Sequence, residues 1–304
     1  MSVDTIIKVE HLAKRFGSFE AVRDVSFKVN RGDVFGFLGP NGAGKSTTIR
    51  CMLSLIKHDS GTIEMFGKSY DKSRSEILSK IGSIIEKPDF YKYLSAEKNL
   101  EIFARISGAK VSKKEIQEML EFVGLTGRGK DKIGGFSHGM KQRLGIAQTL
   151  LHQPDLIILD EPTTGLDPQG IVEIRNLILR LKTEQNKTVL LSSHQLSEIE
   201  LIANRMVIIN KGKTIVEGDV KDLLNAQEIV VKLEVDKMNE TCELLSKAFE
   251  IKEMNRLNDT EFEINIEKQL VPKVNELLVQ NGIKVQSIEP KRKLEDFFMK
   301  IIQS

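Results

Sequence analysis

GPNGAGKS, from Gly39 to Ser46, is the stretch that decides how this 304-residue chain folds. It fits the pattern G-x-x-x-x-G-K-[S/T], directly after an apolar run at residues 34–38 and before a helical pattern that starts near Thr47. Glycines allow successive backbone N–H groups to point inward at phosphate oxygens, and the start of a helix favours negative charge. We therefore expect a phosphate-binding loop between a buried strand and a helix.

Two side chains of this loop have separate predicted tasks. Lys45 is expected to reach the β- and γ-phosphates of a nucleotide, and the Ser46 hydroxyl is expected to bind Mg²⁺. The alternative is a glycine-rich turn with an incidental lysine, which the full match between strand and helix disfavours. The remaining residues expected to contact ATP here are Gly39, Asn41, Gly42, Ala43, Gly44 and Thr47.

A second apolar run, residues 156–159, ends in two consecutive acids, Asp160 and Glu161. At the carboxyl end of a strand both acids can approach a nucleotide as the chain turns through Pro162. Asp160 is expected to hold Mg²⁺, directly or through water, and Glu161 to polarise the attacking water. An Asp-Glu pair alone would be an ordinary polar strand end, but the phosphate-binding loop upstream favours the catalytic interpretation.

The composition argues against several classes of protein. The chain has 45 basic and 43 acidic residues, a net charge of +2, so no nucleic-acid partner is expected. Cys51 and Cys242 stand alone, as in a reduced cytosolic protein without a structural metal or disulfide framework. We expect no signal peptide at the start. The apolar runs are far shorter than the roughly 20 residues that span a bilayer, so another polypeptide is expected to supply any membrane part.

The rest of the chain predicts two units. Short apolar strands alternate with helical patterns up to about residue 225, which favours a largely parallel sheet covered by helices, and residues 99–153 read as helical. Beyond that point the predicted order is β-α-β-β-α-β, which suggests a small ferredoxin-like domain. A final amphipathic helix is expected from Leu294 to Ile302. No residue of this second unit points to a chemical task.

The stretch FSHGMKQRL, residues 136–144, lies between the two sites, and Ser137 is placed to start a helix. The chain here resembles the ATP-binding subunits of ABC transporters, whose signature is most often L-S-G-G-Q followed by a helix rich in Gln and Arg. This copy keeps Ser137 and Gly139 and departs at Phe136, His138 and Met140. The resemblance extends from about residue 6 to residue 218.

This resemblance implies a fold class and domain bounds. The α/β fold is an ABC-type P-loop nucleotide-binding domain at residues 1–225, with a mostly parallel core sheet, an antiparallel β subdomain and a helical subdomain at about residues 87–153. A small α+β ferredoxin-like domain follows at residues 226–304. The implied activity is ATP hydrolysis, with ATP and Mg²⁺ bound, coupled to transport through a separate membrane permease.

The resemblance also assigns roles to single residues. Phe16 corresponds to the aromatic that stacks on adenine, although a lone Phe also suits a core position. His194 corresponds to the switch histidine that contacts the γ-phosphate, and we count it with Lys45 and Glu161 as catalytic. Gly165-Leu166-Asp167 corresponds to the D-loop, which crosses a dimer interface. In the implied head-to-tail homodimer, Ser137, Gly139 and Asp167 act on the ATP of the partner subunit.

Glu86 departs from the residue that the ABC family usually has at its position, and this departure narrows the resemblance to a smaller group of transporters. The family usually has a Gln at this joint between the core and the helical subdomain, and its neutral amide reaches Mg²⁺ and the attacking water. Glu86 would bring a full charge there, an E-loop in place of a Q-loop, and a carboxylate is the better ligand for a hard cation. We predict that Glu86 is a Mg²⁺-dependent sensor of ATP that contacts both the ion and the nucleotide. The alternative is a solvated loop acid.

The E-loop and the signature together resemble the ATPases of bacitracin exporters and lantibiotic-immunity transporters. This implies a peripheral protein at the cytoplasmic face of the cell membrane that powers the export of a membrane-active peptide antibiotic, or resistance to one. Export of another drug, lipid or ion is the alternative, and a soluble ABC protein outside transport is a further one. Phe90, Tyr91, Tyr93 and Leu94 are candidates for the groove that receives a permease helix, or they pack inside the helical subdomain.

Overall fold

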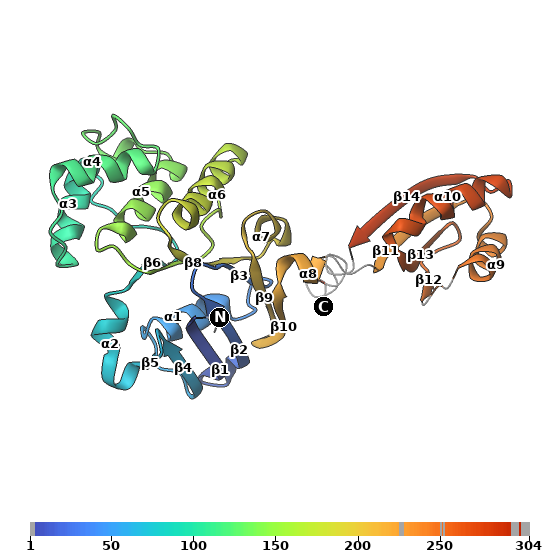
Figure 1. Cartoon of the computed structure of the whole chain (residues 1–304), viewed down its shortest axis with the longest axis horizontal. Helices are drawn as coiled ribbons and strands as arrows, with labels where there is room; N and C mark the ends of the chain where they lie inside the picture. The colour runs from blue at the N-terminus through green and yellow to red at the C-terminus, as the bar shows by residue number, and fades with distance from the viewer. Residues whose placement is uncertain (1–3, 225–227, 250, 252, 293–297, 299–304) are drawn as a thin grey trace. The chain divides into compact units, whose positions relative to one another are not determined.

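The chain forms two compact units, Met1–Asp219 and Val220–Ser304, in a computed structural model that describes residues 4–224, 228–249, 251, 253–292 and 298. The division falls six residues before the boundary predicted at 225/226, because the short helix α8 (Val220–Leu224) groups with the second unit. Figure 1 labels most of the helices and strands of both units.

A parallel group of strands forms the centre of the first unit. Its order is β9-β3-β8-β7-β6, within a ten-stranded sheet that continues as β5-β4-β1-β2-β10 on the β9 side. Every residue of β3, β7 and β8 is buried, which is why β7 is apolar throughout and β3 and the middle of β8 lack charged side chains. The strands are β3 (Val34–Leu38), β6 (Ile81–Ile84), β7 (Leu156–Leu159), β8 (Thr188–Ser193) and β9 (Arg205–Asn210).

Antiparallel strands form the other half of this sheet. β1 pairs antiparallel with β2 on one side and with β4 on the other, while β10 pairs antiparallel with β9 and, at one position, parallel with β2. Phe27 of β2 packs against Phe35 and Phe37 of β3, with ring centroids 5.7 and 5.1 Å away, so one core lies under both halves. The bounds are β1 (Thr5–Phe16), β2 (Phe19–Asn30), β4 (Ser60–Met65), β5 (Lys68–Ser69) and β10 (Lys213–Asp219).

Helices α3, α4 and α5 gather in one group within the stretch predicted to be helical (Figure 1). Each start carries a serine cap, since Ser95, Ser112 and Ser137 each accept a backbone N–H three residues on, and Ser137 was the one predicted. The helices of this unit are α1 (Lys45–Met52), α2 (Tyr70–Leu78), α3 (Ala96–Ile106), α4 (Lys113–Phe122), η1 (Ile133–Gly135), α5 (His138–Leu150), α6 (Pro168–Thr183) and α7 (Leu196–Ile202).

The second unit has a four-stranded antiparallel sheet in the order β12-β13-β11-β14. Its element order is the predicted β-α-β-β-α-β, and α9 and α10 contribute to a separate apolar core. The elements are β11 (Glu228–Val235), α9 (Met238–Ala248), β12 (Met254–Arg256), β13 (Glu261–Glu267), η2 (Lys268–Leu270), α10 (Val271–Gln280) and β14 (Val285–Arg292). The helix predicted at residues 294–302 lies outside the described residues, apart from Phe298.

Candidate active site

The residues predicted to bind the phosphates and Mg²⁺ and to catalyse hydrolysis follow the carboxyl ends of four neighbouring parallel strands. β3 leads into the phosphate-binding loop, β7 into Asp160 and Glu161, β8 into His194, and β6 into the loop that contains Glu86. Parallel strands end at one edge of a sheet, so segments far apart in the sequence meet there. The backbone N–H of Asp160 donates to Ile84 O at 2.9 Å, which links the end of β7 to the end of β6.

The glycines of the phosphate-binding loop are required by their surroundings. Gly44, at the start of α1, has φ 104°, and a Cβ there would lie 2.6 Å from Ala21 O. A Cβ on Gly39 would lie 2.5 Å from Ile209 O, and Gly42 has φ 81°. A side chain at Gly39 or Gly44 would collide with backbone atoms, and a side chain at Gly42 or Gly44 would strain the backbone conformation. The loop therefore needs glycine to wrap where phosphates are expected.

Lys45 is held at the centre of this loop. Its side chain is only 5% exposed, and Nζ donates to Gly39 O at 2.8 Å and to Pro40 O at 3.2 Å. The same Nζ lies 3.1 Å from Glu161 Oε1. The structure thus brings Lys45 into direct contact with Glu161, the second of the two acids that follow β7, although 116 positions separate these residues in the sequence.

Glu161 lies at the centre of a small polar network. His194 Nδ1 is 3.0 Å from its Oε2, and the Thr164 hydroxyl donates to the same oxygen at 2.8 Å. Burial raises the pKa of Glu161, but the Thr164 hydrogen bond and the charge of Lys45 outweigh burial and hold the pKa below its usual value. The carboxylate is therefore ionised at neutral pH, as a group that polarises water must be.

Asp160 is buried, at 3% exposed, and is oriented by a neighbouring strand. The hydroxyl of Ser192 donates to Asp160 Oδ1 at 2.6 Å and accepts from the backbone N–H of Glu161 at 2.9 Å. One serine of β8 therefore positions both acids of β7. Sequence reasoning assigned no task to Ser192 or to Thr164. Thr164 lies only three residues after Glu161, which is a local signal, whereas Ser192 is 32 residues from Asp160 and meets it only through the pairing of β7 with β8.

The oxygen donors at this edge suit Mg²⁺. The carboxylate of Asp160 and the hydroxyl of Ser46 are hard ligands of the kind this ion takes, usually with only one or two protein carboxylates and with substrate phosphates completing the shell. The described residues contain no group of three or more His, Cys, Asp or Glu side chains arranged to hold a metal by themselves. A site of this type would bind the ion together with its nucleotide.

Glu86 follows β6 in a left-handed conformation, with φ 63°. Its side chain is 67% exposed and forms an ion pair with Arg50 in the last turn of α1. The sequence interpretation did not identify this partner. Exposed ion pairs contribute little to stability, so the carboxylate can exchange Arg50 for another cation at low cost.

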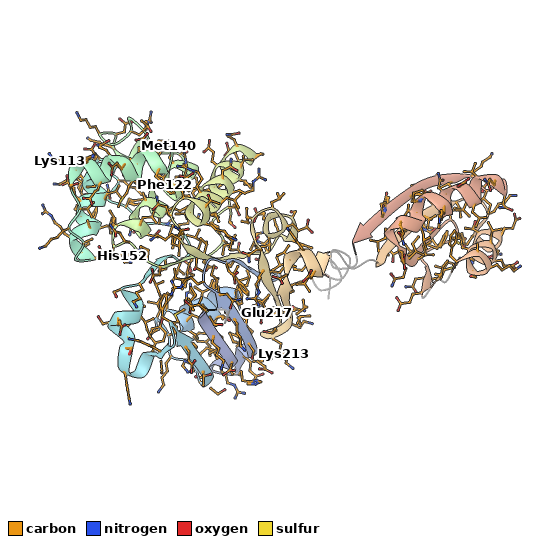
Figure 2. The ribbon with its side chains drawn as sticks, in the orientation of Figure 1. Lys113, Phe122, Met140, His152, Lys213 and Glu217 are labelled. Atoms are coloured by element: carbon orange, nitrogen blue, oxygen red, sulfur yellow. The ribbon has the colours of Figure 1, made fainter. Side chains whose placement is uncertain are left out.

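The residues predicted to act on a partner's nucleotide lie at two helix starts. Ser137 caps α5 by accepting from Met140 N at 3.2 Å, and Asp167 caps α6 by accepting from Gly170 N at 3.0 Å. Met140, labelled in Figure 2, marks the first turn of α5. Gly139 lies next to the loop 165–167, since a Cβ there would be 4.0 Å from a methyl group of Leu166. The signature and the D-loop are thus neighbours within one subunit.

The aromatic candidates divide into buried and exposed rings. Phe16, at the end of β1, is 49% exposed and lies under Lys14 Nζ at 5.4 Å, so it is not a core residue, and its stacking on adenine stays a prediction. Phe90 is buried against Phe103, with centroids 6.0 Å apart. Tyr91 and Tyr93 are exposed, at 43% and 69%, and Leu94 is half-buried.

Known proteins resemble this chain over its catalytic unit and beyond. A family model described as ABC transporter matches residues 22–164. The bacitracin transport ATP-binding protein BcrA of Bacillus licheniformis is 45% identical over 301 residues, which cover 99% of this chain and 98% of that protein. The lantibiotic transport ATP-binding protein SrtF of Streptococcus pyogenes is 42% identical over 224 residues, covering 74% of this chain and 95% of that protein.

A solved structure has the same fold. It is cbiO1 from Clostridium perfringens, described as part of the ABC transporter complex cbiONQ, with a TM-score of 0.66 and 28% identity. The superposition covers 73% of this chain and 92% of that one. The similarity to BcrA, in contrast, spans nearly the whole chain and therefore includes the small second unit.

Proposed function

Because this chain belongs to the ABC transporter family, as one of its ATP-binding subunits, we propose that it powers a separate membrane permease that exports a membrane-active peptide antibiotic. The observation that carries the motor function is the contact chain from Lys45 through Glu161 to His194 beside the phosphate-binding loop. Such a chain of contacts connects the group that binds the terminal phosphates with the group that polarises the attacking water and the group that contacts the γ-phosphate.

In this proposal each side chain has one task in ATP hydrolysis. Lys45 holds the β- and γ-phosphates, and Glu161 polarises the water that attacks the γ-phosphate. His194, oriented by Glu161, contacts the γ-phosphate. Ser46 and Asp160 hold Mg²⁺, which when bound neutralises the charge that develops on the phosphates.

The second half of each site comes from a partner subunit in a head-to-tail homodimer. Ser137 and Gly139 begin a helix, and a helix start is a favourable place for an anion, yet a different helix start, that of α1, follows the phosphate-binding loop of the same chain. Asp167 accompanies them at the start of α6. Two ATP molecules would then join the subunits, and their hydrolysis would release them, which is the cycle that moves a permease.

The permease contact is proposed at Tyr91 and Tyr93, which are exposed beside each other with ring centroids 6.2 Å apart. They follow Glu86 by a few residues, so a movement at the nucleotide would reach them through a short loop. The described residues include no helix long and apolar enough to cross a membrane. In this proposal the chain is attached to its permease and for that reason lies peripherally, at the cytoplasmic face of the cell membrane.

The cargo is inferred from relatives alone. BcrA and SrtF are named for transport of bacitracin and of a lantibiotic, and both kinds of molecule are peptides that act at membranes. Within this chain the Glu at position 86, where the family usually has Gln, accompanies that similarity. Another drug, a lipid or an ion is the alternative cargo.

Co-expression of this chain with its permease is expected to raise the minimum inhibitory concentration of bacitracin or a lantibiotic several-fold in a sensitive bacterium. The control co-expresses the same permease with the Glu161→Gln form of this chain. It should confer no resistance because ATP hydrolysis is removed. Unchanged resistance to the peptides together with raised resistance to a non-peptide drug would overturn the proposed cargo. Recovery of the chain on ribosomes instead of with the permease would overturn its role in transport.

Glu86→Gln is expected to raise the Mg²⁺ concentration needed for half-maximal ATPase activity about threefold to tenfold, because a neutral amide is a weaker ligand for a hard cation. The measurement is phosphate release at fixed ATP over a series of Mg²⁺ concentrations. Asp89→Asn is the matched control, since it removes another exposed acid three residues along the same loop. If Glu86→Gln and Asp89→Asn give the same Mg²⁺ curve as the unchanged protein, Glu86 is a solvated loop acid.

A further inference from the structure

His138 joins two segments that are expected to face the partner subunit. It is the first residue of α5, between Ser137 and Gly139, and its Nδ1 lies 3.2 Å from Gly165 O in the D-loop. A carbonyl oxygen only accepts, so Nδ1 must be the donor in this hydrogen bond. The contact spans 27 positions of the sequence and ties the start of α5 to the loop before α6.

The ring of His138 packs closely against Gly165. Gly165 has φ 77°, and a Cβ added to it would lie 3.3 Å from Cε1 of the His138 ring. Other polar side chains nearby already have local tasks, because Ser137 caps α5 and Asp167 caps α6. Among the hydrogen bonds recorded for the described residues, the imidazole supplies the side-chain link between the signature segment 136–140 and the D-loop 165–167.

We propose that His138 is a positioning residue that holds the signature and the D-loop in one fixed arrangement before the partner's ATP arrives. The inference rests on the proposed function, because both segments matter in this way only if they complete the nucleotide site of a second copy of this chain. The signature most often has glycine at this position, which has no side chain to make the link. This chain therefore carries a restraint that such a signature lacks.

The physical reason is pre-organisation. Loops that must be ordered during association weaken it, and a restraint already present in the free subunit removes part of that cost. Each homodimer contains two copies of the His138 link, one for each ATP, so the loss of both acts twice on the same association. The effect should appear in dimer formation with ATP, while ATP binding to a single subunit should not change.

The test compares His138→Ala with His138→Asn, both in a Glu161→Gln background that slows hydrolysis. Asn carries an amide on the same carbon that bears Nδ1 in histidine, so it can donate to Gly165 O from the same place. His138→Ala is expected to raise the dissociation constant of the ATP-dependent dimer about tenfold. His138→Asn is expected to keep most of the original affinity. The readouts are sedimentation velocity with ATP and Mg²⁺, and binding of a fluorescent ATP analogue to the monomer.

His152→Ala is the matched control. The ring of His152 makes the same kind of contact, with Nε2 3.0 Å from Ile81 O, just past the other end of α5. Figure 2 labels both His152 and Met140, which mark these two ends. His152→Ala should leave dimerisation unchanged, and thermal melting of every variant separates a loss of folding from a loss of association.

Each outcome decides between the inference and its premise. If the Glu161→Gln protein itself stays monomeric with ATP, the proposed function fails before His138 is tested. If it dimerises and His138→Ala dimerises equally well, the positioning role is wrong. A folded His138→Asn that is as weak as His138→Ala would also overturn the inference, because the hydrogen bond would then not be the cause.

Discussion

Glu161→Gln is expected to lower the steady-state rate of ATP hydrolysis about 10²- to 10⁴-fold while leaving ATP binding intact, so that the protein accumulates as an ATP-bound dimer. The side chain contacts Lys45 at 3.1 Å and His194 at 3.0 Å, and its depressed pKa keeps it charged at neutral pH. Glutamine has the same shape and still accepts the hydrogen bond from Thr164, but it cannot polarise water as a carboxylate does.

The measurements for this variant are phosphate release and sedimentation with ATP and Mg²⁺. Glu198→Gln is the matched control, because Glu198 lies in the same region but hydrogen-bonds to Thr163 and Ser193. It should keep most of the activity. A Glu161→Gln protein that hydrolyses ATP at the normal rate would remove Glu161 from the catalytic role, and a monomer under saturating ATP would count against the dimer.

Lys45→Ala is expected to reduce ATP hydrolysis about 10²- to 10³-fold and to weaken ATP binding as well. The ammonium group is buried, is fixed by the carbonyl groups of Gly39 and Pro40, and is placed where the terminal phosphates are expected. Its removal takes a positive charge from a site with little water, where a charge acts more strongly than in solvent. This variant should therefore lose both affinity and rate, unlike Glu161→Gln.

Titration with a fluorescent ATP analogue and phosphate release distinguish the two variants. Lys57→Ala is the control for Lys45→Ala, since Lys57 is an exposed lysine in the segment that follows α1. We expect Lys57→Ala to bind and hydrolyse ATP normally. Retention of normal ATP affinity by Lys45→Ala would show that the phosphates are held by other groups.

The pattern of the sequence was enough to predict the ABC fold and the family, and the relatives confirm both. Strands β3 and β7 were expected from their apolar runs at residues 34–38 and 156–159, and these are their observed bounds. The predicted β-α-β-β-α-β order of the second unit is also the observed one, with a short edge strand, β12, of three residues (Met254–Arg256). Short edge strands carry few residues and little periodicity, so their limits depend on their neighbours.

Two of the loop interpretations needed the structure. The four aromatic or apolar residues after Glu86 were expected either to form a permease groove or to pack inward, and the fold separates them, with Phe90 buried and Tyr91 and Tyr93 exposed. Glu86 itself was expected to be a Mg²⁺-dependent sensor of ATP or a solvated loop acid, and the structure adds its ion pair with Arg50. Neither result follows from spacing, because both depend on how helices α1 and α3 lie against the loop.

What the sequence by itself determined is the set of local requirements. Glycines at fixed spacing before Lys45 define a loop that only such residues can form, and acids after a buried strand define where metal and water are to be bound. Only the tertiary structure decided the long-range partners: Ser192 for Asp160, His194 for Glu161 and Gly165 for His138. The physical reason is range, since backbone conformation follows largely from neighbouring residues, whereas a hydrogen bond between groups far apart in the sequence needs the packing of strands, helices and loops to bring its two atoms within about 3 Å.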